Sequence, residues 1–161
     1  MISIDVRHPD VEKFITIKQD LTKVTGANIS IQLRDDFMKA VKNDEDYMLR
    51  FPCHEEPYEK GIPEELKKLL EETAYNVLSK IRRADGKIYY CKKIKAREIW
   101  NKIIEAAHKS AEPGLMFLDK HWDYSPDSVY PQYKGVTTNP CGEIFMQSYD
   151  ACRLLATNLI S

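Results

Sequence analysis

Apolar and polar residues alternate at the start of the chain, and a helix-like spacing of apolar residues follows. The alternation over residues 2–6 predicts a strand, and the apolar positions within 11–18 recur three and four residues apart, as on one face of a helix. In residues 28–33 the apolar side chains return to every second position, which predicts a second strand. A strand, a helix and a strand in this order predict a βαβ unit.

The rest of the pattern continues to alternate between helical and extended segments. Proline at position 63 suits the first turn of a long helix, and Asp85-Gly86 is a turn signal at its end. The predicted elements are, in order, a helix over 35–41, an extended piece over 47–51, a loop over 52–62, a helix from 63 to about 83, a strand over 87–94, a helix from 96 to about 110, an apolar run over 115–118 and a loop over 124–133. This succession indicates an α/β fold, and no linker divides it into two domains.

The composition is that of an ordered globular protein. The 161 residues are 43% apolar and 10% aromatic, enough to bury a core without disulfides or structural metal. The formal charge of -1 suggests neither nucleic acid nor a membrane surface as a partner. No apolar run approaches the roughly 20 residues of a membrane span, and the amino terminus lacks a leader pattern. The sequence therefore predicts a cytoplasmic protein.

Four cysteines stand at positions 53, 91, 141 and 152, without a CxxC pair or the Cys/His spacing of a zinc ribbon. We therefore expect no metal site. Because cytosolic thiols stay reduced, a disulfide formed here is expected to be transient and chemical in purpose. Cys91 lies inside the predicted strand 87–94, where it is expected to serve packing.

The segment from Asn139 to Glu143 carries an amide, a thiol and a carboxylate at every second residue. If its backbone is extended, Asn139, Cys141 and Glu143 project to one side with roughly 6 to 7 Å between neighbours, a spacing that suits a ribose. Pro140 stiffens the segment and Gly142 has no side chain, so such a loop can enter a tight pocket. Spacing alone does not establish catalysis, because an isolated cytosolic cysteine is more often without a catalytic role.

Two motifs stand in this region. The first is NPCGE at residues 139–143, and the second is YDACRLLATNL at 149–159, which places Cys152 eleven residues after Cys141. Together they resemble the large catalytic subunit of ribonucleotide reductases and are most similar to its adenosylcobalamin-dependent class. Further blocks follow in the family's order, at 5–10, 23–30, 95–100 and 112–119, and the loop 124–131 also resembles members of that class. The resemblance covers nearly the whole chain.

The resemblance implies a role for each polar residue of the two motifs. Cys141 matches the cysteine whose thiyl radical abstracts the 3′-hydrogen of a ribonucleotide. Glu143 matches the base that takes the 3′-hydroxyl proton, and Asn139 matches the amide that orients the sugar hydroxyls. Cys152 matches one of two cysteines that deliver reducing equivalents and end as a disulfide. On sequence pattern alone, a buried apolar thiol is an equally good interpretation of Cys152.

The resemblance also implies ligands. Adenosylcobalamin would be the radical source, although no cobalamin-binding motif is readable in the chain. The substrate would be a ribonucleoside di- or triphosphate, and a deoxynucleotide would act as effector. The polar stretch 19–28 corresponds to the family's substrate-specificity loop, with Lys23, Thr25, Gly26 and Asn28 as candidate residues. The alternative for this stretch is an ordinary connection between a helix and a strand.

The fold that the resemblance implies is a ten-stranded α/β barrel carrying the active-site finger loop. This chain has only about six strand candidates, so residues 1–161 are expected to be one segment of that barrel, incomplete at both ends. Unpaired strand edges and uncovered apolar faces then require the remaining segments of the subunit or an oligomer. The alternative is a catalytically inert assembly or interaction module of a split subunit. In either case we expect no turnover by the isolated chain.

Overall fold

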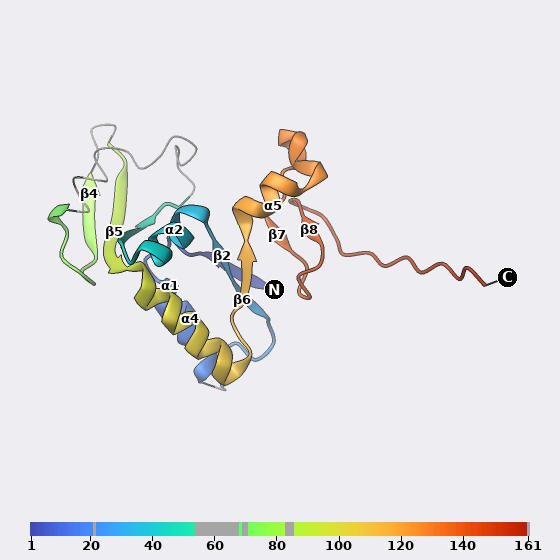
Figure 1. The fold of residues 1–161 in the computed structure, drawn as a ribbon, viewed down its shortest axis with the longest axis horizontal. Coiled ribbons are helices and arrows are strands. Elements are labelled where there is room, and N and C mark those ends of the chain that lie inside the picture. The colour runs from blue at the N-terminus through green and yellow to red at the C-terminus, as the bar shows by residue number, and fades with distance from the viewer. Residues whose placement is uncertain (21, 54–67, 69–70, 83–85, 161) are drawn as a thin grey trace.

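The computed structural model describes residues 1–20, 22–53, 68, 71–82 and 86–160. Its strands form a three-stranded parallel sheet, a three-stranded antiparallel sheet and a two-stranded hairpin. Figure 1 shows the antiparallel sheet at one end of the molecule and the hairpin toward the other, with the carboxyl-terminal tail leading away from the hairpin. The mixture of helices and sheets confirms the predicted α/β class. The described strands do not close into a barrel.

The parallel sheet contains the predicted βαβ unit. Strand β1 (Ile2–Asp5) is followed by helix α1 (Val11–Thr16) and a 3-10 turn, η1 (Ile17–Gln19), before β2 (Ile29–Leu33). The third strand, β6 (Gly114–Phe117), pairs with the other side of β2, so the order is β1-β2-β6 with all strands parallel. The strand–helix–strand prediction is therefore confirmed.

The two faces of this sheet differ in chemistry because side chains alternate along each strand. On β2, Ile31 and Leu33 belong to the core, whereas Ser30 and Gln32 point to the opposite face. The core side is completed by α1, by α2 (Asp35–Asn43) and by α4 (Ala96–Ser110). The buried side chains from these helices include Val11, Ile15, Phe37, Ala40, Ile99 and Ile103. One face of the sheet is thus covered by helices and the other is polar.

The antiparallel sheet corrects one prediction. It has the order β3-β5-β4, with β3 (Asp46–Phe51), β5 (Ile88–Lys95) and β4 (Ser79–Arg82). The helix predicted from 63 to about 83 is wrong from residue 73 on, because residues 73–78 are not helical and residues 79–82 are strand β4. Pairing with β5 satisfies the backbone groups along one side of β4, and Ile81 packs on the buried Tyr89 and Cys91. Residues 63–67, 69–70 and 83 of the predicted helix lie outside the described residues, as does most of the loop predicted over 52–62.

The last third of the chain leads from β6 to the hairpin. Helix α5 (Leu118–Tyr124) follows β6 directly, and the predicted loop 124–133 contains two 3-10 turns, η3 (Pro126–Val129) and η4 (Pro131–Tyr133). Strands β7 (Thr137–Thr138) and β8 (Phe145–Met146) then pair antiparallel. Residues 150–160 have no regular structure and are exposed. None of the described helices has the length and apolar character needed to cross a membrane.

Candidate functional site

The β7–β8 hairpin rests on the polar face of the parallel sheet, opposite the helices (Figure 1). The Gln32 side chain of β2 donates from Nε2 to Ser3 Oγ at 3.0 Å and to the Val136 carbonyl at 3.3 Å, just before β7. Thr138 Oγ1 lies 4.0 Å from Met1 Sδ at the start of β1. These contacts place the hairpin so that its loop points toward the end of the sheet where β1 begins.

Helix α5 anchors the hairpin from the side. Trp122 donates from its indole Nε1 to the Gly135 carbonyl at 2.8 Å, and the His121 ring lies 4.7 Å from the Phe145 ring of β8. Gly135 is buried, and a Cβ at that position would lie 2.3 Å from the Phe145 ring. The hairpin can approach this closely only because residue 135 has no side chain.

The loop 139–144 is a tight turn, so the condition on which the one-sided arrangement depended, an extended backbone, is not met. Asn139 N donates to the Ile144 carbonyl at 3.1 Å, and Gly142 N donates to the Asn139 carbonyl at 3.0 Å. Gly142 has φ +89°, in the left-handed region that glycine adopts without strain. Closing a hairpin over four residues requires such a turn. The alternation of side chains assumed for Asn139, Cys141 and Glu143 therefore does not apply.

The structure separates the predicted site residues by burial. Asn139 is 1% exposed, whereas Cys141 and Glu143 are exposed at the turn. The Asn139 Oδ1 atom accepts hydrogen bonds from Gly142 N and Ile144 N, both at 3.1 Å, and Nδ2 lies 3.5 Å from Cys152 Sγ. The structure thus brings Asn139 and Cys152 together and leaves the Cys141 thiol and the Glu143 carboxylate open to solvent.

The four cysteines fall into two groups. Cys53 and Cys91 are buried, and burial raises the pKa of the Cys53 thiol to about 12 and that of Cys91 to about 11. The predicted packing role of Cys91 is confirmed by its place in the small core of the antiparallel sheet. Cys141 and Cys152 are exposed. The interpretation of Cys152 as a buried apolar thiol is therefore wrong.

The candidate specificity loop lies in the connection between η1 and β2. All four of its candidate residues are exposed: Lys23, Thr25, Gly26 and Asn28. The Lys23 ammonium pairs with Asp20 at 3.1 Å, and the Asn28 carbonyl accepts from Ile2 N at 2.8 Å, which ties the loop to the start of β1. This is the same end of the sheet toward which the hairpin loop points.

A buried charge network at the carboxyl ends of the parallel strands was not predicted. Arg34, directly after β2, binds Asp5 Oδ2 through Nη2 at 2.8 Å and Asp119 Oδ1 through Nη1 at 2.9 Å. Its guanidinium also lies 4.6 Å from the centre of the Trp122 ring. Charged residues at the ends of two predicted strands and of the apolar run 115–118 were the available signal, since the ends of parallel strands meet at one edge of a sheet.

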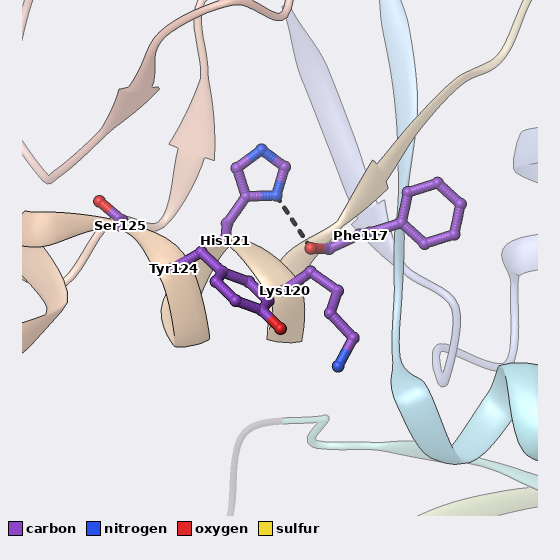
Figure 2. Close-up of a pocket in the computed structure, with 5 residues that line it drawn as sticks. All are labelled: Phe117, Lys120, His121, Tyr124 and Ser125. Atoms are coloured by element: carbon purple, nitrogen blue, oxygen red, sulfur yellow. Dashed lines mark hydrogen bonds between the residues drawn. The ribbon is translucent and has the colours of Figure 1, made fainter.

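Beside this network, an open and largely apolar hollow of about 500 Å³ lies along α5 (Figure 2). Phe117, Lys120, His121, Tyr124 and Ser125 line it, and His121 Nδ1 lies 2.9 Å from the Phe117 carbonyl. None of the predicted site residues borders this hollow. In the described part of the chain, no three His, Cys, Asp or Glu side chains gather as metal ligands would.

Comparison with known proteins identifies the family. The family model described as "Ribonucleotide reductase, barrel domain" matches residues 1–161. A vitamin B12-dependent ribonucleoside-diphosphate reductase of Thermoplasma acidophilum is 32% identical over 157 residues, covering 97% of this chain and 16% of the relative. The protein of the same name from Mycobacterium tuberculosis is 28% identical, covering 99% of this chain and 18% of the relative.

A third relative, a vitamin B12-dependent ribonucleotide reductase of Agrobacterium fabrum, is 30% identical over 151 residues, which are 94% of this chain and 9% of the relative. The chain thus spans less than a fifth of the length of each of these curated relatives. The match of the barrel-domain model covers the motifs at 139–143 and 149–159, together with the blocks before them. This chain belongs to the ribonucleotide reductase family, and the family model that matches it describes the barrel domain.

Proposed function

We propose that this chain is a segment of a catalytic barrel that reduces ribonucleotides to deoxyribonucleotides through a thiyl radical on Cys141. The observation that supports this most is the placement of Cys141, an exposed thiol at the turn of a hairpin that α5 and the polar sheet face hold in place. A radical thiol must reach a substrate, and a fixed hairpin presents it in one orientation. The ten-stranded barrel and the finger loop belong to this proposal.

The proposed chemistry assigns the residues as follows. The Cys141 thiyl radical takes the 3′-hydrogen of the ribose and returns it at the end of the cycle. Glu143 accepts the 3′-hydroxyl proton while the 2′-hydroxyl leaves as water. Two thiols, Cys152 and a cysteine elsewhere in the complete subunit, supply two electrons and two protons and become a disulfide. One ribonucleotide and two thiols thus yield one deoxyribonucleotide, one disulfide and one water.

We propose adenosylcobalamin as the cofactor, because the relatives are named vitamin B12-dependent. When bound, this cofactor supplies the initiating radical. The described residues do not form a site that fits this cofactor. The hollow along α5 is open and largely apolar, and no residue of the loop that contains Cys141 lines it. We therefore derive no step through the cofactor. What the chain contributes is an exposed thiol that the radical can reach.

The remaining ligands follow from the same proposal. The substrate is a ribonucleoside di- or triphosphate, and a deoxynucleotide effector acts through the loop that contains Lys23, Thr25, Gly26 and Asn28. All four residues are exposed, as an effector-reading loop requires. The complete protein is proposed to be cytoplasmic and to form an oligomer.

A second candidate is an assembly module without turnover of its own. The tail supports it, because Leu154, Leu155, Leu159 and Ile160 are each at least 87% exposed. Strands β1 and β6 also form the two edges of the parallel sheet in the described part of the chain. Such surfaces need a covering polypeptide. The two proposals are compatible if activity belongs to the assembled subunit.

The decisive experiment uses the complete protein that carries this segment. Cys141→Ser should abolish deoxyribonucleotide formation, because a hydroxyl does not replace the radical thiol. Glu143→Gln should lower it by about 10²- to 10⁴-fold, the usual contribution of a general base. Glu105→Gln is the matched control, because Glu105 forms an exposed ion pair with Lys109 on α4. Parental activity in Cys141→Ser would refute the proposal.

A further inference from the structure

The side chain of Asn139 is used inside the protein rather than presented to solvent. It is 1% exposed. Its Oδ1 accepts two backbone N–H groups, from Gly142 and Ile144, and its Nδ2 contacts Cys152 Sγ. An amide oxygen has two lone pairs, so both acceptor positions of this carboxamide are occupied by its own loop.

We propose that Asn139 is a positioning residue, which clamps the loop of Cys141 through Oδ1 and holds Cys152 beside that loop through Nδ2. One side chain then sets both the shape of the loop and the surroundings of Cys152. The meaning of this coupling for catalysis rests on the function proposed above, but the clamp itself does not.

The loop needs such a clamp because its strands are short. β7 and β8 contain two residues each, too few to fix the geometry of a connecting loop by backbone pairing alone. Pro140 has no N–H to offer. Ile144 N finds its acceptor in Asn139 Oδ1, and Gly142 N is shared between the Oδ1 atom and the carbonyl of Asn139. The buried amide therefore supplies hydrogen bonds that the hairpin backbone lacks.

The contact with Cys152 connects the clamp to a segment that is otherwise exposed. Residues 148–160 are exposed, and Cys152 lies thirteen residues after Asn139. The Nδ2–Sγ contact of 3.5 Å brings the Cys152 thiol to the base of the loop that carries Cys141 at its turn. With Oδ1 saturated, Asn139 can offer a substrate only an N–H, so it could orient a sugar oxygen only as a donor.

Amide hydrogen exchange tests the clamp directly, with three variants of this chain. Asn139→Ala removes both interactions, and Asn139→Asp keeps the acceptor oxygen but loses the N–H donor. Asn101→Ala, at an exposed position of α4, is the control. The Ile144 amide should exchange about tenfold faster in Asn139→Ala, and at the parental rate in Asn139→Asp and Asn101→Ala. Unchanged protection of Ile144 in Asn139→Ala would overturn the clamp.

Alkylation of Cys152 tests the second half of the proposal. The carboxylate of Asn139→Asp cannot donate to the sulfur, and its charge opposes the thiolate, which is the reactive form. Iodoacetamide should therefore modify Cys152 several-fold more slowly in Asn139→Asp, while Cys141 keeps its rate as an internal reference. Proteolysis after Glu143 separates the two cysteines for mass spectrometry. Equal Cys152 rates in parent and Asn139→Asp would refute the coupling.

These measurements remain informative whatever happens to the proposed function. If Asn139→Ala fails to fold, the alkylation rate of Cys152 in Asn139→Asp still tests the contact between Asn139 and Cys152. Neither readout requires substrate, cofactor or turnover. A reductase that stays active in Cys141→Ser would therefore refute the proposed chemistry without affecting the clamp. Unchanged Ile144 exchange in Asn139→Ala would refute the clamp without affecting the proposed chemistry.

Discussion

The four cysteines carry the same functional group in two different environments. Cys91 is fully buried and Cys53 nearly so, and the loss of hydration disfavours their thiolates. Cys141 and Cys152 are exposed, one at the hairpin turn and one in contact with Asn139. The two exposed cysteines are therefore the two that the family motifs contain.

This difference predicts selective modification of the folded chain. At pH 8, iodoacetamide should alkylate Cys141 and Cys152 and spare Cys53 and Cys91, whose raised pKa values of about 12 and 11 keep them protonated. The buried thiols should become reactive only above those pH values or after unfolding in urea. Peptide mass spectrometry of timed samples measures each site. Early alkylation of Cys91 at pH 8 would contradict its burial.

At the scale of elements, the buried Arg34 network joins the ends of the parallel strands to α5. Arg34 is 4% exposed and bonds to Asp5, the last residue of β1, and to Asp119 in the first turn of α5. Asp119 also accepts from Asp35 N at 2.8 Å, at the start of α2. Because α5 in turn holds the hairpin through Trp122, this network fixes the element that carries the candidate site.

Replacing Arg34 should therefore destabilise the fold strongly. Arg34→Met leaves the buried Asp5 carboxylate without its partner, and the free energy of unfolding should fall by about 3–5 kcal/mol. The matched control is Lys109→Met, which breaks an exposed ion pair with Glu105 on α4 and should cost at most about 0.5 kcal/mol. Urea denaturation followed by circular dichroism measures both. Equal midpoints for the two variants would exclude a structural role for the network.

At the scale of the whole molecule, the carboxyl-terminal tail, residues 150–160, is exposed and adds no side chain to the buried core. Its apolar side chains at 154, 155, 159 and 160 are almost completely exposed, in a chain that spans less than a fifth of each relative compared above. Exposed apolar segments of this kind favour association with other polypeptides. We therefore expect the tail to contribute to association rather than to the stability of the described fold.

Deletion of residues 153–161 tests this separation. Because the tail buries little surface, the melting temperature should change by no more than about 2 °C. The same deletion should reduce self-association of the isolated chain in analytical ultracentrifugation. The control is the intact chain at the same concentration. A large fall in melting temperature would mean that the tail packs on the fold in solution.

Elements with a strong local pattern could be predicted from the sequence. Helix α4 runs over Ala96–Ser110, the predicted range, because its apolar residues recur at helical spacing and Glu112-Pro113-Gly114 ends the pattern. The βαβ unit was predicted for the same reason. The residues 79–82 were predicted as helix and form β4, since their conformation depends on pairing with β5, which local periodicity does not report.

The motifs at 139–143 and 149–159, together with the blocks before them, carried the family resemblance in the sequence by itself, because they preserve residue types at fixed spacing. Only the tertiary structure decided that the loop turns, that Asn139 is buried against its own backbone, and that Cys152 lies beside it. The same holds for Arg34, whose partners Asp5 and Asp119 are 29 and 85 residues away. Periodicity is a local property of the chain, whereas burial and pairing depend on segments that folding brings together.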